Sequence, residues 1–199
     1  MSRKNKIKYG IKNCHVAKIT AGDTTTGYTY GTPFAMPGAI SISLNNSMST
    51  ANIAADDIED YASQSVNNGY EGPLEVVELP EQFAEEILGD TNGVEDSDVK
   101  MAEFALLFEF DGDQKKGRRC LWRCSLTQRP SITHNTKSAN FSIDSDTLNI
   151  KAMPRLNDHK VKGTCYEDWD IYDDFFSAVS EPSAFVPPSD TDTTEETEP

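Results

Sequence analysis

The chain has 199 residues, which suits one domain, or one domain with a tail, and is too short for several. Its formal net charge of −15 makes it a poor partner for free nucleic acid, because such binding needs cations that release phosphate counterions. The longest apolar runs cover only a few residues, whereas a membrane helix needs about 20. No apolar segment follows the N-terminal bases, so neither a membrane span nor a secretory signal is expected.

The charges are segregated along the chain. Residues 1–18 carry six bases and no acid, and residues 19–99 carry 15 acids and no Lys or Arg. Residues 100–162 carry 12 bases against 7 acids, and residues 163–199 carry 11 acids and no base. Two interpretations stay open: a fold that interleaves these blocks within one subunit, or segments of opposite charge that meet between copies of the chain.

Strands dominate the first third of the predicted structure. Residues 1–10 form an extended basic arm, and a first strand covers residues 13–20. Residues 21–38 are rich in Thr, Gly and Tyr and predict a loop or an irregular hairpin. Strict alternation of apolar and polar residues over positions 39–44 predicts a half-buried strand. Residues 49–66 favour two short strands around an acidic turn.

A strand at residues 70–79 leads into a short helix at residues 80–89. Pro80 suits the first helical turn, and Gly89 suits the C-terminal cap. Such a short helix is not stable alone, so it must dock on a sheet. The residues expected in this helix-to-sheet core are Phe83, Ile87 and Leu88.

The strongest hairpin is predicted at residues 101–110 and 118–127. Alternation predicts that Cys120, Trp122, Cys124 and Leu126 share one face of its second strand. Arg119 and Arg123 share the opposite face, where they are either exposed or paired across an interface. The residues expected either in the sheet core or in a sheet between subunits are Phe104, Leu106, Phe108 and Trp122.

The last part of the chain changes character. Phe141 and Ile143, followed by residues 148–152, predict a second hairpin. Residues 165–179 favour a short amphipathic helix, although their aromatic density also fits an extended arm. The whole pattern predicts an all-β fold, a β-sandwich with a flanking short α-helix. It divides into a basic arm at residues 1–10, a sandwich domain at residues 11–180, and an acidic disordered tail at residues 181–199.

Motifs for catalysis or cofactor binding are lacking in the sequence. There is no GxSxG, Walker or GxGxxG motif, so neither an enzyme nor a cofactor is expected. Cys120 and Cys124 would lie about 13 Å apart along a strand, too far for a disulfide. Three scattered histidines give no zinc spacing, and His15 is expected to be an ordinary strand residue. The acidic clusters at residues 56–60 and 95–98 lack the EF-hand pattern and are expected to be solvated loops.

Five stretches, taken together and in order, carry a resemblance to a known family. They are YGIKNCHVAKIT at 9–20, YGTPFAMPGAISISL at 30–44, NNGYEGPLEVVELPEQFAEEILG at 67–89, FALLFEFDGDQKKGRRCLWRCSLTQRPS at 104–131 and LNIKAMPR at 148–155. The sequence resembles the major tail proteins of long-tailed, non-contractile bacteriophages, which are the subunits of the tail tube. The acidic end after Pro182 departs from the resemblance.

This resemblance implies a structural virion protein with no catalytic residues. Its subunits would form sixfold rings that stack into a tube, with strands of neighbouring copies lining a β-barrel lumen. The tape-measure protein would occupy the lumen, tail terminator and tail-tip proteins would bind the tube, and viral DNA would pass through without specific binding. Assembly would take place in the host cytoplasm and the product would belong to the virion.

The charge pattern adds an expectation about contacts between copies. Basic residues of the N-terminal arm are expected to meet acidic loops of neighbouring subunits. A monomeric β-sandwich adhesin or receptor-binding decoration is the alternative, and a carbohydrate-active enzyme with two converging carboxylates is a third possibility. The residues expected at the subunit interface are Arg3, Lys4, Lys6, Lys8, Asp56, Asp57, Glu59, Asp60, Glu95, Asp96 and Asp98.

Overall fold

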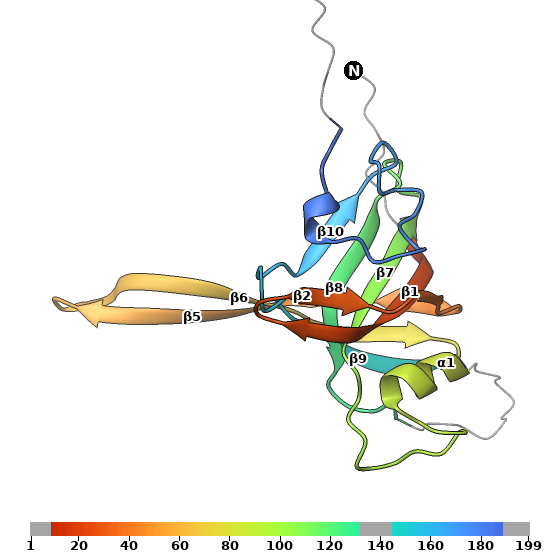
Figure 1. The fold of residues 1–199 in the computed structure, drawn as a ribbon. Helices are drawn as coiled ribbons and strands as arrows, with labels where there is room; N and C mark the ends of the chain where they lie inside the picture. The colour runs from red at the N-terminus through yellow and green to blue at the C-terminus, as the bar shows by residue number, and fades with distance from the viewer. Residues whose placement is uncertain (1–8, 132–144, 189–199) are drawn as a thin grey trace, which may run out of the picture.

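The computed structural model describes residues 9–131 and 145–188, and within them the fold is all-β with one short helix (Figure 1). Ten strands, all paired antiparallel, belong to one sheet, whose main path runs β2-β1-β7-β8-β9-β6-β4. β3 pairs with β1, β5 with β6, and β10 with β8. The strands are β1 (Tyr9–Asp23), β2 (Gly27–Tyr30), β3 (Phe34–Ala35), β4 (Ala39–Ile42), β5 (Asn45–Ala55), β6 (Ile58–Val76), β7 (Phe104–Asp111), β8 (Arg118–Leu126), β9 (Asp146–Ala152) and β10 (Lys162–Cys165).

The sheet curls over its own core. β4, at one end of the strand order, contacts β1 near the other end. Apolar residues of β1, β6, β7, β8 and β9 therefore meet in one cluster, which the flanking helix completes. Phe83 and Ile87 are fully buried there and Leu88 is nearly so, as the sequence predicts. Phe104, Leu106 and Phe108 are buried in the same cluster, which favours a core role within the subunit.

The flanking helix has the predicted ends but an unusual second turn. α1 (Glu81–Phe83) continues directly into a π-helical turn, η1 (Ala84–Leu88). Pro80 precedes the first turn in an extended conformation, and Gly89 ends the helix in the left-handed region at φ 81°. An L side chain is disfavoured at that φ, so glycine suits the position.

A bulge in β8 changes which side chains share a face. Between Leu121 and Cys124 the pairing advances three residues on β8 but only two on β7. An extra residue in one strand reverses the alternation, because successive side chains point to opposite faces. The prediction that four residues share a face is therefore wrong: Cys120 and Trp122 lie on one face, and Cys124 and Leu126 on the other.

The outer face of the sheet is covered by the C-terminal segment, residues 166–186, which we call the strap. The helix predicted over residues 165–179 is not formed; the segment follows successive turns instead. Tyr172, Phe175 and Phe185 pack with Leu107 and Trp122 in a second apolar cluster. Phe185 packs on Trp122 with ring centroids 5.1 Å apart, so ordered packing extends beyond residue 180. The final turn is a 3-10 helix, η2 (Pro182–Ala184).

The hairpin in the middle of the chain is longer than predicted. The two short strands expected around an acidic turn form a single long hairpin of β5 and β6, and β6 also includes most of the separate strand expected at residues 70–79. β9 pairs with β6 and β8, while Phe141 and Ile143 lie outside the described residues. The tail from residue 189 also lies outside them.

Candidate interaction surfaces

The long hairpin, residues 45–71, projects far from the curled sheet (Figure 1). Ala55 pairs with Ile58, so the tip is a two-residue turn made of Asp56 and Asp57. Both turn residues have positive φ, 51° and 58°, as a type I′ turn requires. This turn matches the right-handed twist of the two strands, and therefore the chain can continue the hairpin to its full length.

The surface of the long hairpin is solvent-exposed along most of its length. Polar side chains bridge the two strands, as Thr50 to Ser65 at 2.9 Å and Asn52 to Asp60 at 2.7 Å. Large apolar side chains are also exposed, among them Ile53 and Tyr61 near the tip. In the described residues, β5 pairs only with β6, so its outer edge keeps free N–H and C=O groups. An exposed, apolar-bearing hairpin with a free edge is a ready surface for another chain.

A small network of hydrogen bonds fixes the root of the long hairpin. Asn46 Nδ2 donates to Asn67 Oδ1 at 2.9 Å and to the Gly69 carbonyl at 3.2 Å, and Gly69 N–H donates to Asn67 Oδ1 at 2.9 Å. Gly69 has φ 105°, and a Cβ there would lie 1.9 Å from the Ala152 carbonyl oxygen. The backbone of β9 therefore passes directly against the point where the hairpin leaves the body.

A groove of about 330 Å³ lies beside this root. Its floor is built from apolar side chains such as Ile42 and Phe108, which come from β4 and β7. Arg119 lies over the Phe110 ring at 4.6 Å, and Lys162 lies over the Tyr70 ring at 4.3 Å. Within the described chain, the groove is lined by these two cations and by no acid.

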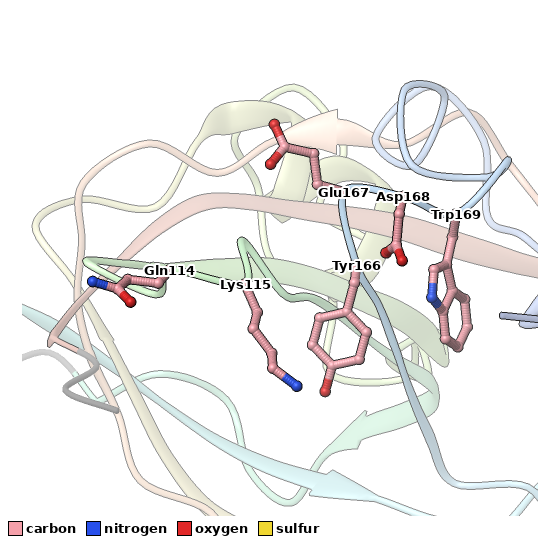
Figure 2. Close-up of a pocket in the computed structure, with 6 residues that line it drawn as sticks. All are labelled: Gln114, Lys115, Tyr166, Glu167, Asp168 and Trp169. Carbon is pink, nitrogen blue, oxygen red and sulfur yellow. The ribbon is translucent and has the colours of Figure 1, made fainter. Parts of the chain in front are cut away.

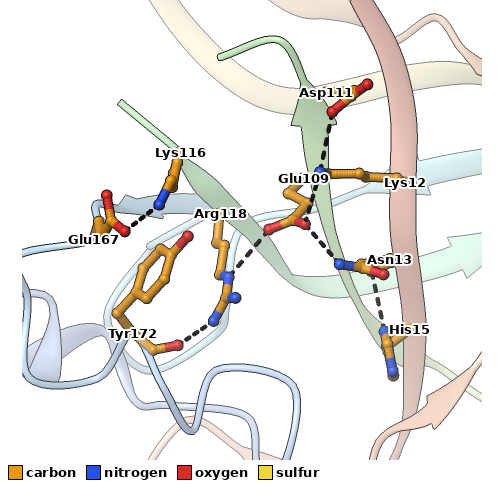
Figure 3. Close-up of polar contacts among 9 residues, drawn as sticks. All are labelled: Lys12, Asn13, His15, Glu109, Asp111, Lys116, Arg118, Glu167 and Tyr172. Carbon is orange, nitrogen blue, oxygen red and sulfur yellow. Dashed lines mark hydrogen bonds and ion pairs between the residues drawn. The ribbon is translucent and has the colours of Figure 1, made fainter. Parts of the chain in front are cut away.

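The strap is attached to the sheet through a buried ion pair (Figure 3). Glu109 is 7% exposed and accepts from Arg118 Nε at 3.1 Å and from Asn13 Nδ2 at 2.6 Å. The Arg118 guanidinium lies 3.7 Å from the centroid of the Tyr172 ring and donates to the Tyr172 carbonyl. Because one guanidinium contacts a sheet carboxylate and the strap together, Glu109 and Arg118 fix the position of the strap.

The end of the strap has a second attachment. Trp122 Nε1 donates to the Ser180 carbonyl at 2.9 Å. Arg155 is 1% exposed, and its Nη2 donates to Glu181 at 2.7 Å. Ser180 and Glu181 are adjacent, so the sheet and the loop after β9 anchor the strap at one point.

Figure 2 shows an open pocket of about 440 Å³ between the β7–β8 turn and the start of the strap. Lys115 lies over the Tyr166 ring at 5.3 Å, and Tyr166 meets Trp169 edge to face at 5.9 Å. Glu167 turns away from the pocket and pairs with Lys116. The rings contact each other or a cation of the same chain, so the pocket offers no open stacking platform.

The residues predicted at an interface divide into three groups. Arg3, Lys4, Lys6 and Lys8 lie outside the described residues. Asp56, Asp57, Glu59 and Asp60 gather at the exposed tip of the long hairpin. Glu95, Asp96 and Asp98 lie in the loop after the helix, on another side of the molecule (Figure 1).

That loop is already neutralised in part by its own chain. Arg129 pairs with Asp90 at 2.9 Å and with Glu95 at 3.0 Å, and it donates to the Leu88 carbonyl. Glu95 therefore has a cation within the subunit, whereas the structure gives no cation partner to the acids at the hairpin tip among the described residues. Of the two predicted acidic clusters, the tip is therefore the one in which no described acid is paired with a cation.

Arginines and cysteines elsewhere have structural roles. Arg123 forms a two-bonded ion pair with Glu103, with both N–O distances at 2.8 Å, so its expected partner comes from the same subunit. The four cysteines are free and buried. Burial raises the pKa of Cys14 to about 12 and that of Cys165 to about 11, so these thiols are poor nucleophiles at neutral pH.

The described part of the chain has neither a membrane-spanning helix nor a cluster of metal ligands. No helix there is long and apolar enough to cross a membrane. No three His, Cys, Asp or Glu side chains in that part of the chain gather as a metal site would require.

No protein family, curated protein or solved structure matches this chain. An assignment of function therefore depends on its own residues and geometry.

Proposed function

We propose that this chain is a structural virion protein, the repeating subunit of a phage tail tube. The observation that carries the proposal is the long hairpin, which projects from the body with exposed apolar side chains and a free strand edge. A lone two-stranded hairpin is marginally stable in water. A hairpin that another copy covers is stabilised by that contact.

The five sequence stretches that resemble tail tube proteins specify the kind of assembly. In this proposal the curled sheet acts as a sandwich-type tube domain, six copies close into a ring, and rings stack. Strand edges of neighbours pair, which removes the free edges. A barrel built by many subunits has too many strands to fill with side chains, and a channel remains.

The charge pattern suits passage of DNA through that channel. With 33 acids against 18 Lys and Arg, the chain offers few cations for phosphate binding. Repulsion from an acidic wall reaches only about 8 Å at physiological salt. DNA would therefore slide through without specific binding, and tape-measure, terminator and tail-tip proteins would contact the tube itself.

The test is electron microscopy of the purified chain at rising concentration, together with its light-scattering mass. We expect rings or tubes with a central hole. Particles of the 22.0 kDa monomer mass at every concentration would contradict the proposal and favour the monomeric adhesin.

A matched variant isolates the long hairpin. Ser49 pairs with Val66, so residues 50–65 can be replaced by Asn-Gly to give a short hairpin with a type I′ turn. This variant keeps the root at Asn46, Asn67 and Gly69. We expect a folded monomer that makes no rings, and ring formation without the hairpin would show that the body alone drives assembly.

A further inference from the structure

The groove beside the root of the long hairpin contains an unsatisfied donor. Arg119 lies over Phe110, and its Nη1 atom is buried without an acceptor among the described residues. Buried polar groups are almost always paired, because leaving a donor desolvated is costly. An acceptor from outside the subunit would supply the missing hydrogen-bond partner of this guanidinium.

The groove has the chemical character of one side of a protein–protein interface. Its floor is apolar, and Arg119 and Lys162 place positive charge at its surface. Apolar centres with charged rims are typical of contacts between proteins. Its complement would be an apolar segment flanked by carboxylates.

The tip of the long hairpin has that complementary chemistry. Ile53 is 63% exposed and Tyr61 is 58% exposed, on facing strands. Their neighbours include the carboxylates of Asp56, Asp57 and Glu59. Residues 19–99 contain no Lys or Arg, so no base of the hairpin would oppose the cations of the groove.

The hairpin of the same molecule cannot supply this tip. The groove borders the root, because it is lined by Leu44 and Tyr70. The 11 residues of β5 extend the tip roughly 35 Å away, at about 3.3 Å per residue. Only the tip of a second copy can enter the groove.

We propose that the hairpin tip of one copy docks in the groove of a second copy. Ile53 covers the apolar floor, and tip carboxylates pair with Arg119 and Lys162. Each copy carries one tip and one groove, so in the proposed tube the contact is heterologous and repeats from copy to copy around a ring or along the stack. This inference rests on the proposed self-assembly and names the surfaces that carry it.

Two other segments of the chain fit the groove less well. The N-terminal arm carries four bases in residues 1–8, which would face two further cations. The C-terminal residues 189–199 are acidic but contain no large apolar side chain for the floor. Of these three segments, the hairpin tip is the one that combines both properties.

Charge reversal in the groove tests the contact. Lys162→Glu changes an exposed side chain of the groove, and Lys160→Glu makes the same change two residues away, outside it. We expect Lys162→Glu to raise the concentration needed for assembly at least tenfold and Lys160→Glu to leave it within about twofold of wild type. Equal effects of the two variants would overturn the inference.

Neutralising the tip tests the other side. Asp56→Asn with Asp57→Gly removes two carboxylates and installs the sequence most favoured in type I′ turns, so the hairpin itself is retained. We again expect weaker assembly by about tenfold. Unchanged assembly would show that the tip carboxylates make no contact.

A cross-link identifies the neighbour directly. A photoreactive phenylalanine at Ile53 is expected to label peptides that contain residues 42–44, 108–121 or 162 of another copy, shown by mixing isotope-labelled and unlabelled chains. The same group at exposed Val94 is the control. Assembly of the wild type with cross-links elsewhere would overturn the docking contact and leave the tube proposal standing. A wild-type chain that never assembles would overturn the tube proposal and, with it, this inference.

Discussion

Glycine 69 shows how one residue sets the direction of the long hairpin. Its φ of 105° and the Ala152 carbonyl, 1.9 Å from the position of a Cβ, together exclude any side chain. Gly93 also has positive φ, 73°, but nothing lies within 4 Å of its Cβ position. Substitutions at the two glycines can therefore distinguish the effect of backbone strain from that of a steric clash with the backbone.

We expect Gly69→Ala to lower the free energy of unfolding by about 3 kcal/mol, since strain and clash both act. Gly93→Ala introduces backbone strain without a clash, so it should lower the free energy of unfolding by about 1 kcal/mol. Urea denaturation of both variants measures the difference. Equal losses would show that β9 moves away from Gly69 at little cost.

The turn between β1 and β2 gives a prediction about pH. Asp23 Oδ1 accepts from the N–H groups of Thr26 and Thr25, both at 2.6 Å, and these bonds lower the pKa of Asp23 below 3.8. Because the folded pKa is the lower one, this stabilisation is complete above the ordinary carboxyl pKa and is lost as pH falls through the folded value. The unfolding temperature should therefore fall more steeply between pH 5 and pH 2 for wild type than for Asp23→Asn. Parallel decreases of the two unfolding temperatures would contradict this.

At the scale of elements, the strap and the helix protect different thiols. Cys120 and Cys165 lie in the cluster under the strap, and Cys14 and Cys124 lie in the core under the helix. Phe175 belongs to the cluster under the strap and Phe83 to the core under the helix, and both are nearly fully buried. Each phenylalanine can thus be tested against the thiols of its own side.

We expect Phe175→Ala to lower the free energy of unfolding by about 3–5 kcal/mol and to speed alkylation of Cys120 and Cys165. Phe83→Ala is the matched control and should act on Cys14 and Cys124 instead. Iodoacetamide labelling followed by peptide mass spectrometry distinguishes the four sites. Labelling of all four thiols in either variant would mean that the two clusters open together.

The elements differ in how far the sequence predicts them. The alternation that places Phe104, Leu106 and Phe108 in the core and the spacing of Phe83, Ile87 and Leu88 were both predicted. The bulge in β8 was not predicted, because the alternation of Cys120, Trp122, Cys124 and Leu126 runs through it without a break in the sequence. The strap shows helical spacing but follows turns, since its rings pack against Trp122 and Arg118 of the sheet and need no helix.

The candidate surfaces divide in the same way. The acids of the tip are visible in the sequence as a cluster, and their position at the end of a long hairpin follows from the pairing of β5 with β6, which continues past two register shifts. The groove is assembled from β4, β6, β7, β8 and β10, so its residues are far apart in sequence. A guanidinium without an acceptor, as at Arg119, is a property of three-dimensional packing alone.

At the scale of the whole molecule, the basic residues before β1 offset an otherwise acidic chain. Removing residues 1–8 takes away Arg3, Lys4, Lys6 and Lys8, and the formal net charge changes from −15 to −19. β1 begins at Tyr9 and holds its place through pairing with β7, so the fold should persist. In the proposed tube, the deletion would remove positive charge that attracts the acidic surface of another copy.

We expect the chain that starts at Tyr9 to melt as wild type does, within about 2 °C, yet to form no long tubes in electron micrographs. Replacing the four bases by Gln in the full-length chain keeps the length of the arm and removes its charge, so it should give the same result if attraction between charges joins the rings. Salt supplies an independent check, because the Debye length falls from about 10 Å at 0.1 M to about 3 Å at 1 M. Wild-type tubes should therefore shorten at high salt. Tubes of wild-type length from the Gln variant would assign ring stacking to contacts other than the basic arm.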